Sequence, residues 1–290
     1  MTKSTSSKLS LIFAMTIFST IGLLRRFIPL SSGTVALARA VIGTAFLCCL
    51  MILRKQKPDI QAIRKNALFL LLSGFALGLN WVLLFEAYNH TTVATATLCY
   101  YMAPILLIIV SPFLFREKMD LRRGLCCFAA VVGIVLVSGV TQTGFSLETD
   151  AKGILLGLAA ALFYACVVAL NKKMQGIAPL SRTVLQLVIS SVVLLPYTLV
   201  AEDLSAVMTM APIGLTLLIV AGVVHTGIAY WLYFDAIGTL NTQTSALLSY
   251  IDPILAIVLS ALFLQEHMGI EAIIGAVLIL GATAVSEIKH

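Results

Sequence analysis

Ten long apolar runs constrain the fold of this 290-residue chain more than any other feature of its sequence. A membrane-spanning α-helix needs about 20 mostly apolar residues, and runs of 18 or more recur here. The mean hydropathy is +1.04, and 60% of the residues are hydrophobic while 11% are charged. Soluble domains are roughly half apolar and about a quarter charged. The chain is therefore predicted to be an integral membrane protein, and its net charge of +6 does not indicate a nucleic-acid partner.

We predict an all-α fold, because the runs are continuous and lack the alternating pattern of membrane strands. The polar N-terminal stretch leads straight into a long apolar run without a small-residue cleavage site, which favours a first membrane helix over a signal peptide. The ten predicted transmembrane helices cover residues 9–27, 33–53, 66–88, 92–115, 122–140, 152–171, 180–200, 211–234, 242–264 and 269–286.

The basic residues indicate an orientation for these helices. If the N-terminus is cytoplasmic, the inside segments hold 15 Lys and Arg residues. The outside loops then hold only three, Arg25, Arg26 and Lys152, and Arg39 lies within a helix. Because cytoplasmic loops carry the excess of Lys and Arg, we expect both termini in the cytoplasm and the protein in the plasma (inner) membrane, surrounded by the lipid bilayer.

One segment of the sequence occurs twice. Residues 85–119 and 234–268 align without a gap at a constant offset of 149, with 12 identities in 35 positions. Both copies carry a Tyr, a Pro three residues later, an apolar run, a Ser and a closing Glu-x-Met. A weaker likeness joins PLSSGTVALARA, from Pro29, to PLSRTVLQLVIS, from Pro179. The chain is therefore predicted to contain two five-helix repeats, residues 1–143 and 144–290.

Five helices per repeat is an odd number, so the second repeat must be inverted relative to the first. Inverted repeats related by an axis in the membrane plane recur among secondary transporters, where they allow one fold to open to either side. This architecture predicts a carrier that works by alternating access.

The motifs also resemble a known family. An Arg in the second helix, within LARA at residues 37–40, and the paired segments from Pro104 to Glu117 and from Pro253 to Glu266, each followed by glycines, resemble EamA-type members of the drug/metabolite transporter (DMT) superfamily. The resemblance covers nearly the whole chain. It implies a ten-helix carrier with a central cavity that moves amino acids, amines, nucleosides or other small metabolites, often outward. We accordingly expect a secondary active exporter of a small polar metabolite.

Five ionisable residues inside or at the ends of the apolar runs are candidates for the site, because such groups are costly in a bilayer. Arg39 binds a substrate carboxylate, pairs with an acid, or anchors neighbouring carbonyls. Asp252, whose counterpart in the first repeat is Ala103, coordinates a cation or proton, or forms a helix–helix hydrogen bond. His225 is a proton relay or a packed histidine. Glu86 and Asp235 end their helices and are coupling or gating candidates, with simple interfacial placement as the alternative.

Aromatic residues near these groups complete the predicted substrate site. They lie five to nine residues inside the helices, whereas interface aromatics lie at helix ends. A ring cluster beside a carboxylate holds an amine by cation–π contact or flanks an amino acid, and ordinary packing is the alternative. Pro104 and Pro253 are predicted helix hinges, since proline removes a backbone hydrogen bond. The further predicted substrate-binding residues are Asn80, Trp81, Tyr101, Tyr230, Trp231 and Tyr250.

Two other classes of protein compete with a carrier. An intramembrane enzyme would need a catalytic motif, and the sequence contains no Gly-x-Ser-x-Gly, His-Glu-x-x-His or Walker A motif. A non-transporting scaffold or regulatory subunit would be favoured by long soluble loops, and the loops here are short. The six cysteines lack metal-ligand spacing. We expect no enzyme activity, metal or cofactor, a small-molecule substrate with a proton or another ion as possible coupling partner, and a monomer or homodimer.

The orientation can be tested by labelling. A cysteine placed in the 54–65 loop is expected to react with a membrane-impermeant maleimide only from the cytoplasmic face, because this loop is rich in Lys and Arg. Inside-out vesicles and intact cells provide the two sides of the measurement. Labelling of this loop in intact cells would overturn the orientation.

Overall fold

Helices form where the sequence has its apolar runs, because a helix satisfies all its backbone hydrogen bonds within one segment. The computed structural model describes residues 3–115, 120–138, 150–237, 239–240 and 242–287, and these residues contain no β-strand. The helices are α1 (Lys3–Ser19), α2 (Ile21–Arg26), α3 (Ser32–Leu53), α4 (Ile60–Lys65), α5 (Ala67–His90), α6 (Val93–Tyr100), α7 (Ala103–Phe115), α8 (Leu121–Val137), α9 (Asp150–Lys173), α10 (Pro179–Ala201), α11 (Ser205–Thr209), α12 (Pro212–Gly222), the π-helix η1 (Val223–Ile228), α13 (Ala229–Ile237), α14 (Thr242–Ser249), α15 (Ile251–Phe263) and α16 (Ile270–Glu287).

The all-helical prediction is confirmed for these residues, and helices occupy each of the ten predicted ranges. Seven stretches of the described chain are long and apolar enough to cross a membrane, and α15 and α16 are shorter apolar helices. The count of ten membrane spans therefore stays a prediction. Three details differ from the sequence analysis. Short helices α4 and α11 lie in predicted loops, and the predicted helices 9–27, 92–115 and 242–264 are each interrupted. The predicted helix 211–234 contains the π-helix η1.

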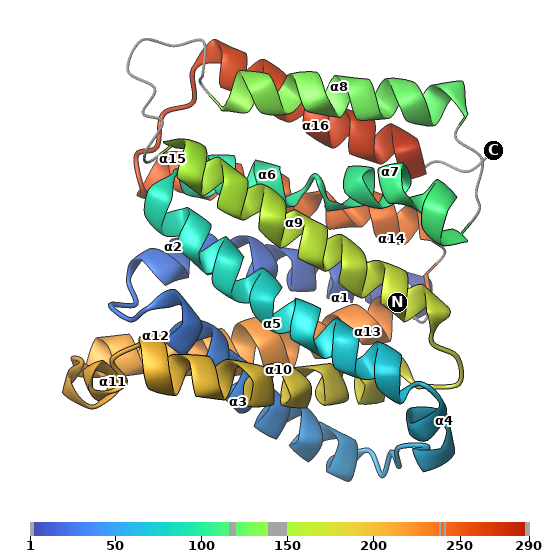
Figure 1. Ribbon diagram of the computed structural model, residues 1–290, viewed down its shortest axis with the longest axis vertical. Coiled ribbons are helices and arrows are strands. Elements are labelled where there is room, and N and C mark those ends of the chain that lie inside the picture. Colours follow the sequence, from blue (N-terminus) through green and yellow to red (C-terminus); the bar gives the residue numbers. More distant parts are fainter. Residues whose placement is uncertain (1–2, 116–119, 139–149, 238, 241, 288–290) are drawn as a thin grey trace.

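The helices pack side by side, and neighbouring helices often come from different repeats. In Figure 1, α8 and α16 lie side by side at one edge of the bundle, α5 runs along α9, and α3 crosses α10 at the opposite edge. The helix α1 packs against α13 and α15, and α6 packs against both α9 and α15. The centre of the bundle is thus formed where α6 and α15 meet.

These contacts have the same pattern in both halves of the chain. The pair of α5 with α9 corresponds to the pair of α13 with α1, and the contacts of α6 and α7 with α9 correspond to those of α14 and α15 with α1. Two further pairs, α3 with α10 and α8 with α16, join an element to its own counterpart. This pattern is what two related five-helix units would produce. The predicted boundary between 143 and 144 lies outside the described residues.

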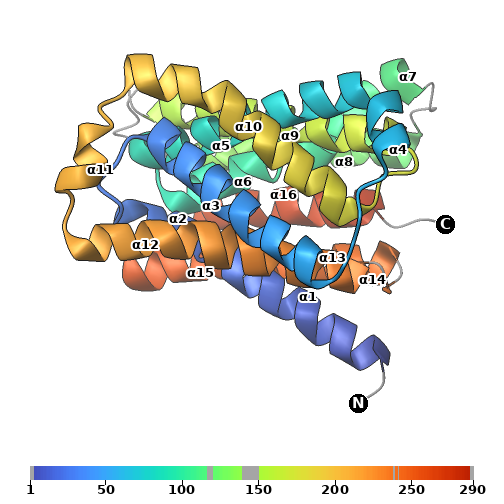
Figure 2. The same ribbon diagram turned by 90° about the horizontal axis from the view of Figure 1, so that it is seen from below.

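The two ends of the bundle carry different parts of the chain. The helix α1 begins and α16 ends at the same end as α4, while α11 lies at the opposite end (Figures 1 and 2). An arrangement with both termini on one side agrees with an even number of crossings. That this side is the cytoplasm remains the prediction made from the basic residues.

Glycines allow α8 and α16 to approach closely. A β-carbon built on Gly275 would lie 2.6 Å from the carbonyl oxygen of Gly133, and one built on Gly133 would lie 2.8 Å from the carbonyl oxygen of Gly275. Both contacts are with backbone atoms, which cannot move without shifting a helix. Small residues at such crossings let membrane helices pack at short distance.

We expect Gly275→Ala to lower the free energy of unfolding by about 1–3 kcal/mol, the usual cost of overpacking a tight contact. The change is measured by thermal or denaturant unfolding of the purified protein in detergent. Gly124→Ala is the control, because a β-carbon at Gly124 meets no atom within 4 Å. Equal stability of the two variants would contradict this account of the crossing.

Candidate functional site

Arg39 in α3 is the most deeply buried charged side chain among the predicted site residues, with 5% of its surface exposed. Its Nε donates a hydrogen bond to Oγ1 of Thr226 at 2.7 Å, and Nη2 lies 3.5 Å from the carbonyl oxygen of His225. The guanidinium also lies over the ring of Trp81, 4.2 Å from its centroid. Hydrogen bonds and a cation–π contact thus replace part of the hydration that burial removes.

The hydrogen-bond partners of Arg39 lie on η1, a π-helical turn between α12 and α13. The hydroxyl of Thr226 is 3.3 Å from the carbonyl of Ala221, and Nδ1 of His225 is 3.3 Å from the carbonyl of Val220. Both side chains therefore reach carbonyls five residues earlier in the chain. Single π-helical turns inside α-helices occur frequently at functional sites.

Glycines bring this turn against α3. A β-carbon at Gly222 would lie 2.5 Å from Cβ of Ile42, and one at Gly227 would overlap the ring of Phe46. Side chains at these two positions would push η1 away from α3. The glycines thus set the short distance over which Arg39 reaches the turn.

His225 connects the same turn to the start of the chain. Its Nε2 lies 2.8 Å from Oγ1 of Thr20, the residue that joins α1 to α2. The side chain is buried, and its backbone carbonyl faces Arg39. The predicted coupling residue thus lies in the shell around Arg39, and its proton-relay role stays a prediction.

The predicted hinges coincide with real interruptions of the helices. The α-helix is interrupted at Tyr101 and at Tyr250, which are equivalent positions in the two repeats and lie three residues before Pro104 and Pro253. The backbone angles are similar, with φ −71° and ψ 1° at Tyr101 and φ −71° and ψ −10° at Tyr250. Because proline has no N–H, neither proline can donate to the carbonyl four residues before it.

Asp252 lies directly after the second interruption and is half-buried. Its Oδ2 accepts a hydrogen bond of 2.7 Å from the hydroxyl of Tyr101, which lies at the first interruption. The interrupted helices of the two repeats are therefore joined at their equivalent break points. The second repeat has Asp252 where the first repeat has Ala103. Only the second repeat therefore contributes a carboxylate to this hydrogen bond.

Tyrosines fill the region between Arg39 and Asp252. Tyr88 and Tyr100 interact electrostatically with both charged groups, and Tyr230 interacts with Arg39. Within the described part of the chain, Arg39 and Asp252 form no ion pair with each other. Nη1 of Arg39 and Oδ1 of Asp252 likewise have no hydrogen-bond partner among the described residues. Two opposite charges from different repeats thus interact with the same tyrosines and form no ion pair with each other among the described residues.

Three predicted site residues lie apart from this centre. Asn80 is fully buried and donates a hydrogen bond of 2.7 Å to the carbonyl of Ala160, so its amide joins α5 to α9. Trp231 and Asp235 line a cavity of about 130 Å³ at the end of the bundle near Arg54. Arg54 lies 3.5 Å from Asp235 and 5.3 Å from the centroid of the Trp231 ring. Trp231, Asp235 and Arg54 thus lie together around this cavity.

Glu86 lies at the opposite end, which carries α11. Its carboxylate accepts hydrogen bonds from the hydroxyl of Ser32 at 2.7 Å and from the amide of Asn89 at 3.0 Å, and it lies 3.1 Å from Nε2 of His90. This carboxylate is thus held in a polar network between α3 and α5. A coupling or gating role for Glu86 and Asp235 remains a prediction.

The chain matches a known family over nearly its full length. The sequence model described as "EamA-like transporter family" matches residues 5–139 and again residues 151–287. The chain belongs to the EamA-like transporter family. The resemblance stated from the sequence is thereby confirmed.

Relatives of this EamA-like transporter include three bacterial proteins. "Uncharacterized transporter YxxF" of Bacillus subtilis (strain 168) is 26% identical over 288 residues, which is 99% of this chain and 91% of the relative. "Protein PecM" of Dickeya dadantii (strain 3937) is 23% identical over 242 residues, 82% of this chain and 78% of the relative. "Protein RarD" of Escherichia coli (strain K12) is 24% identical over 251 residues, 85% of this chain and 81% of the relative.

The fold is also found in a solved structure. A structure described as "Crystal structure of protein" matches with a TM-score of 0.67, and the match covers 97% of both chains. Its sequence identity to this chain is 18%, so the match shows a shared fold alone.

The sequence did not reveal the partners of two carboxylates, Glu202 and the Glu266 that closes the second repeat segment. Glu202 accepts hydrogen bonds from the N–H of Gly33 and the hydroxyl of Thr34 at the start of α3. Glu266 accepts from the N–H of Val93 at 2.9 Å at the start of α6. Both carboxylates cap helix starts on distant segments, where they satisfy free N–H groups and the positive helix end. The local signals of these two starts are the serine and threonine residues within 31–34 and Thr92, whose hydroxyl accepts from the N–H of Thr95.

We expect Thr226→Val to lower the free energy of unfolding by about 1.5–3 kcal/mol, because Arg39 loses a hydrogen-bond acceptor inside the bundle. Denaturant unfolding in detergent provides the measurement. Thr216→Val on α12 is the control, since the Thr216 hydroxyl is exposed and bonds only to the Pro212 carbonyl. A Thr226→Val variant as stable as the control would show that the Thr226 hydroxyl does not support Arg39.

Proposed function

We propose that this EamA-like transporter is a secondary carrier that exports a small zwitterionic metabolite, with an amino acid as the leading class. The observation that carries the proposal is the placement of Arg39 and Asp252. They are opposite charges on helices from different repeats, both interact electrostatically with Tyr88 and Tyr100, and they form no ion pair with each other among the described residues. An amino acid presents the complementary pair, a carboxylate and an ammonium group on one carbon.

Each end of such a substrate has a matching partner. The guanidinium of Arg39 offers N–H donors to a carboxylate, an interaction that is stronger than a neutral hydrogen bond. Asp252 offers an acceptor to the ammonium group, and Tyr101 holds this carboxylate in place through a hydrogen bond of 2.7 Å. The rings of Trp81 and the neighbouring tyrosines supply an apolar and cation–π surface for the rest of the molecule.

Alternating access is supported by the two equivalent interruptions. A helix bends most easily where its hydrogen-bond ladder is broken, and both breaks lie at the hydrogen bond between Tyr101 and Asp252. A substrate that binds Asp252 competes with or extends this bond. Binding at the centre would thus act on both breaks together. The sequence contains no nucleotide-binding motif, so the proposed energy source is a gradient of an ion, such as the proton, or of the substrate.

The two ends of the bundle support export. At the end with α11, Glu266 forms an ion pair with Arg26 at 3.2 Å and also accepts from Val93. At the end with α4, the pair of Arg54 and Asp235 is longer, at 3.5 Å, and borders the cavity of about 130 Å³. With the predicted orientation, the more open end is cytoplasmic, which suits loading of a substrate from inside.

The experiment compares matched ligands on the purified protein by thermal shift. A screen of L-amino acids identifies the best binder, which is then compared with its decarboxylated amine and its deaminated carboxylate; for leucine these are isopentylamine and 4-methylpentanoate. We expect only the zwitterion to stabilise the protein strongly, since a ligand stabilises the state that it binds.

Two substitutions assign the charges. Arg39→Gln should remove the advantage of the amino acid over its amine, and Asp252→Asn should remove the advantage over the carboxylate. Each change is expected to weaken amino-acid binding roughly 10- to 100-fold, the effect of losing one hydrogen bond to a charged group. If the amine stabilised the protein as strongly as the amino acid does, the site would recognise only a cation. If no amino acid stabilised the protein, the proposal would be wrong.

Transport provides an independent test of Asp252. The Asp252→Asn variant should fold in detergent and lose or uncouple uptake into proteoliposomes, because the remaining amide cannot balance an ammonium group or bind a proton. Uptake that is the same as wild type at pH 5 and at pH 8 would remove Asp252 from the mechanism.

A further inference from the structure

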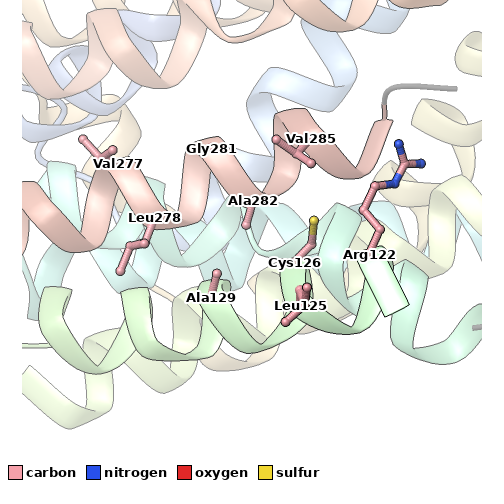
Figure 3. Close-up of a pocket in the computed structure, with 9 residues that line it drawn as sticks. All are labelled: Arg122, Leu125, Cys126, Ala129, Val277, Leu278, Gly281, Ala282 and Val285. Carbon is pink, nitrogen blue, oxygen red and sulfur yellow. The ribbon is translucent and has the colours of Figure 1, made fainter. Parts of the chain in front are cut away.

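A groove runs between α8 and α16 at the edge of the bundle, away from Arg39 and Asp252 (Figures 1 and 3). Its volume is about 360 Å³. This lies in the range of about 300–1,000 Å³ that is typical of small-molecule sites. Neither helix contributes a residue to the site at the centre, so the groove needs its own explanation.

The groove is apolar and has a floor of small side chains. Ala129, Gly281 and Ala282 line it, and a β-carbon built on Gly281 would meet no atom within 4 Å. The rims are formed by exposed apolar side chains, with Leu125 59% and Val277 67% exposed. Exposed apolar rims around an unfilled floor suit a hydrocarbon chain in the bilayer.

The groove is lined along about two turns of each helix. Its lining on α8 runs from residue 122 to residue 129, which corresponds to about 10 Å along a helix. Figure 3 shows the lining residues of both helices following the same line, with Arg122 beside Val285 at one end. An extended acyl chain fits this shape better than a compact solute.

The end with Arg122 is basic. Arg122 and Arg123 are the second and third residues of α8, and Asp120 caps the helix by accepting from the N–H of Arg123 at 2.7 Å. Two guanidinium groups and the positive end of α8 therefore lie at this end of the groove, together with the carboxylate of Asp120. A guanidinium matches a phosphate group in charge and shape. In the predicted orientation this end faces the cytoplasmic headgroup region, where basic pockets between helices bind anionic lipid.

We propose that this groove binds one acyl chain of an anionic phospholipid, with the phosphate against Arg122. This inference does not depend on the proposed substrate. A second copy of the chain suits the groove less well, because a two-fold dimer in the membrane would bring the same surface of both chains together. The two Arg122 side chains would then approach each other as like charges.

The test uses the full-length protein, purified and exposed to phosphatidylglycerol or phosphatidylcholine with identical acyl chains. Native mass spectrometry counts the lipid that stays bound. We expect the wild-type protein to prefer phosphatidylglycerol roughly tenfold, the effect of one charge-assisted contact. Gly281→Leu places a side chain in the groove and should reduce binding of both lipids, whereas Arg122→Gln should remove only the preference.

Gly124→Leu is the matched control, because Gly124 also has open space at its β-carbon but does not line the groove. It should bind lipid as the wild type does. Thermal unfolding checks that Gly281→Leu is folded, and Arg122→Gln tests the headgroup contact separately. Full lipid retention by Gly281→Leu, equal binding of both lipids by the wild type, or a dimer that Gly281→Leu converts to a monomer would each overturn the proposal.

Discussion

The cost of burying one positive charge shapes the centre of this protein. The guanidinium of Arg39 is held by Thr226, by the carbonyl of His225 and by the ring of Trp81. These partners require α12 and α13 to be joined by a π-helical turn, and the turn requires glycines at 222 and 227 where it meets α3. An apolar residue at position 39 would need none of these features. The local irregularity of η1 is therefore best understood as the surroundings that a buried arginine needs.

The helix interruptions occur in both repeats, whereas the charged residues near them do not. Tyr101 and Tyr250 interrupt their helices at the same position and with similar backbone angles. The residue before each proline differs, since Ala103 stands in the first copy where Asp252 stands in the second. Arg39 likewise belongs to the first repeat only. If the proposed zwitterionic substrate binds here, its two charged ends would fix one orientation between two nearly equivalent helical hairpins.

Much of this arrangement could be predicted from the sequence, because it depends on local composition. Apolar runs gave the helix ranges, the matched prolines gave the interruptions, and the lone charges gave Arg39 and Asp252. The rest depends on contacts between distant segments. The site of η1 carries no proline. No local pattern encodes these contacts.

The cap that Glu266 provides has a consequence for motion. This residue follows α15, in the second repeat, yet it satisfies N–H groups at the start of α6 in the first. Moving the end of α15 outward would leave those N–H groups without an acceptor and expose the positive end of α6. The carboxylate of Glu266 thus links the end of α15 to the start of α6 through hydrogen bonds and charge. A conformational change that opens this end must either carry α6 along with α15 or supply water to the uncovered helix start.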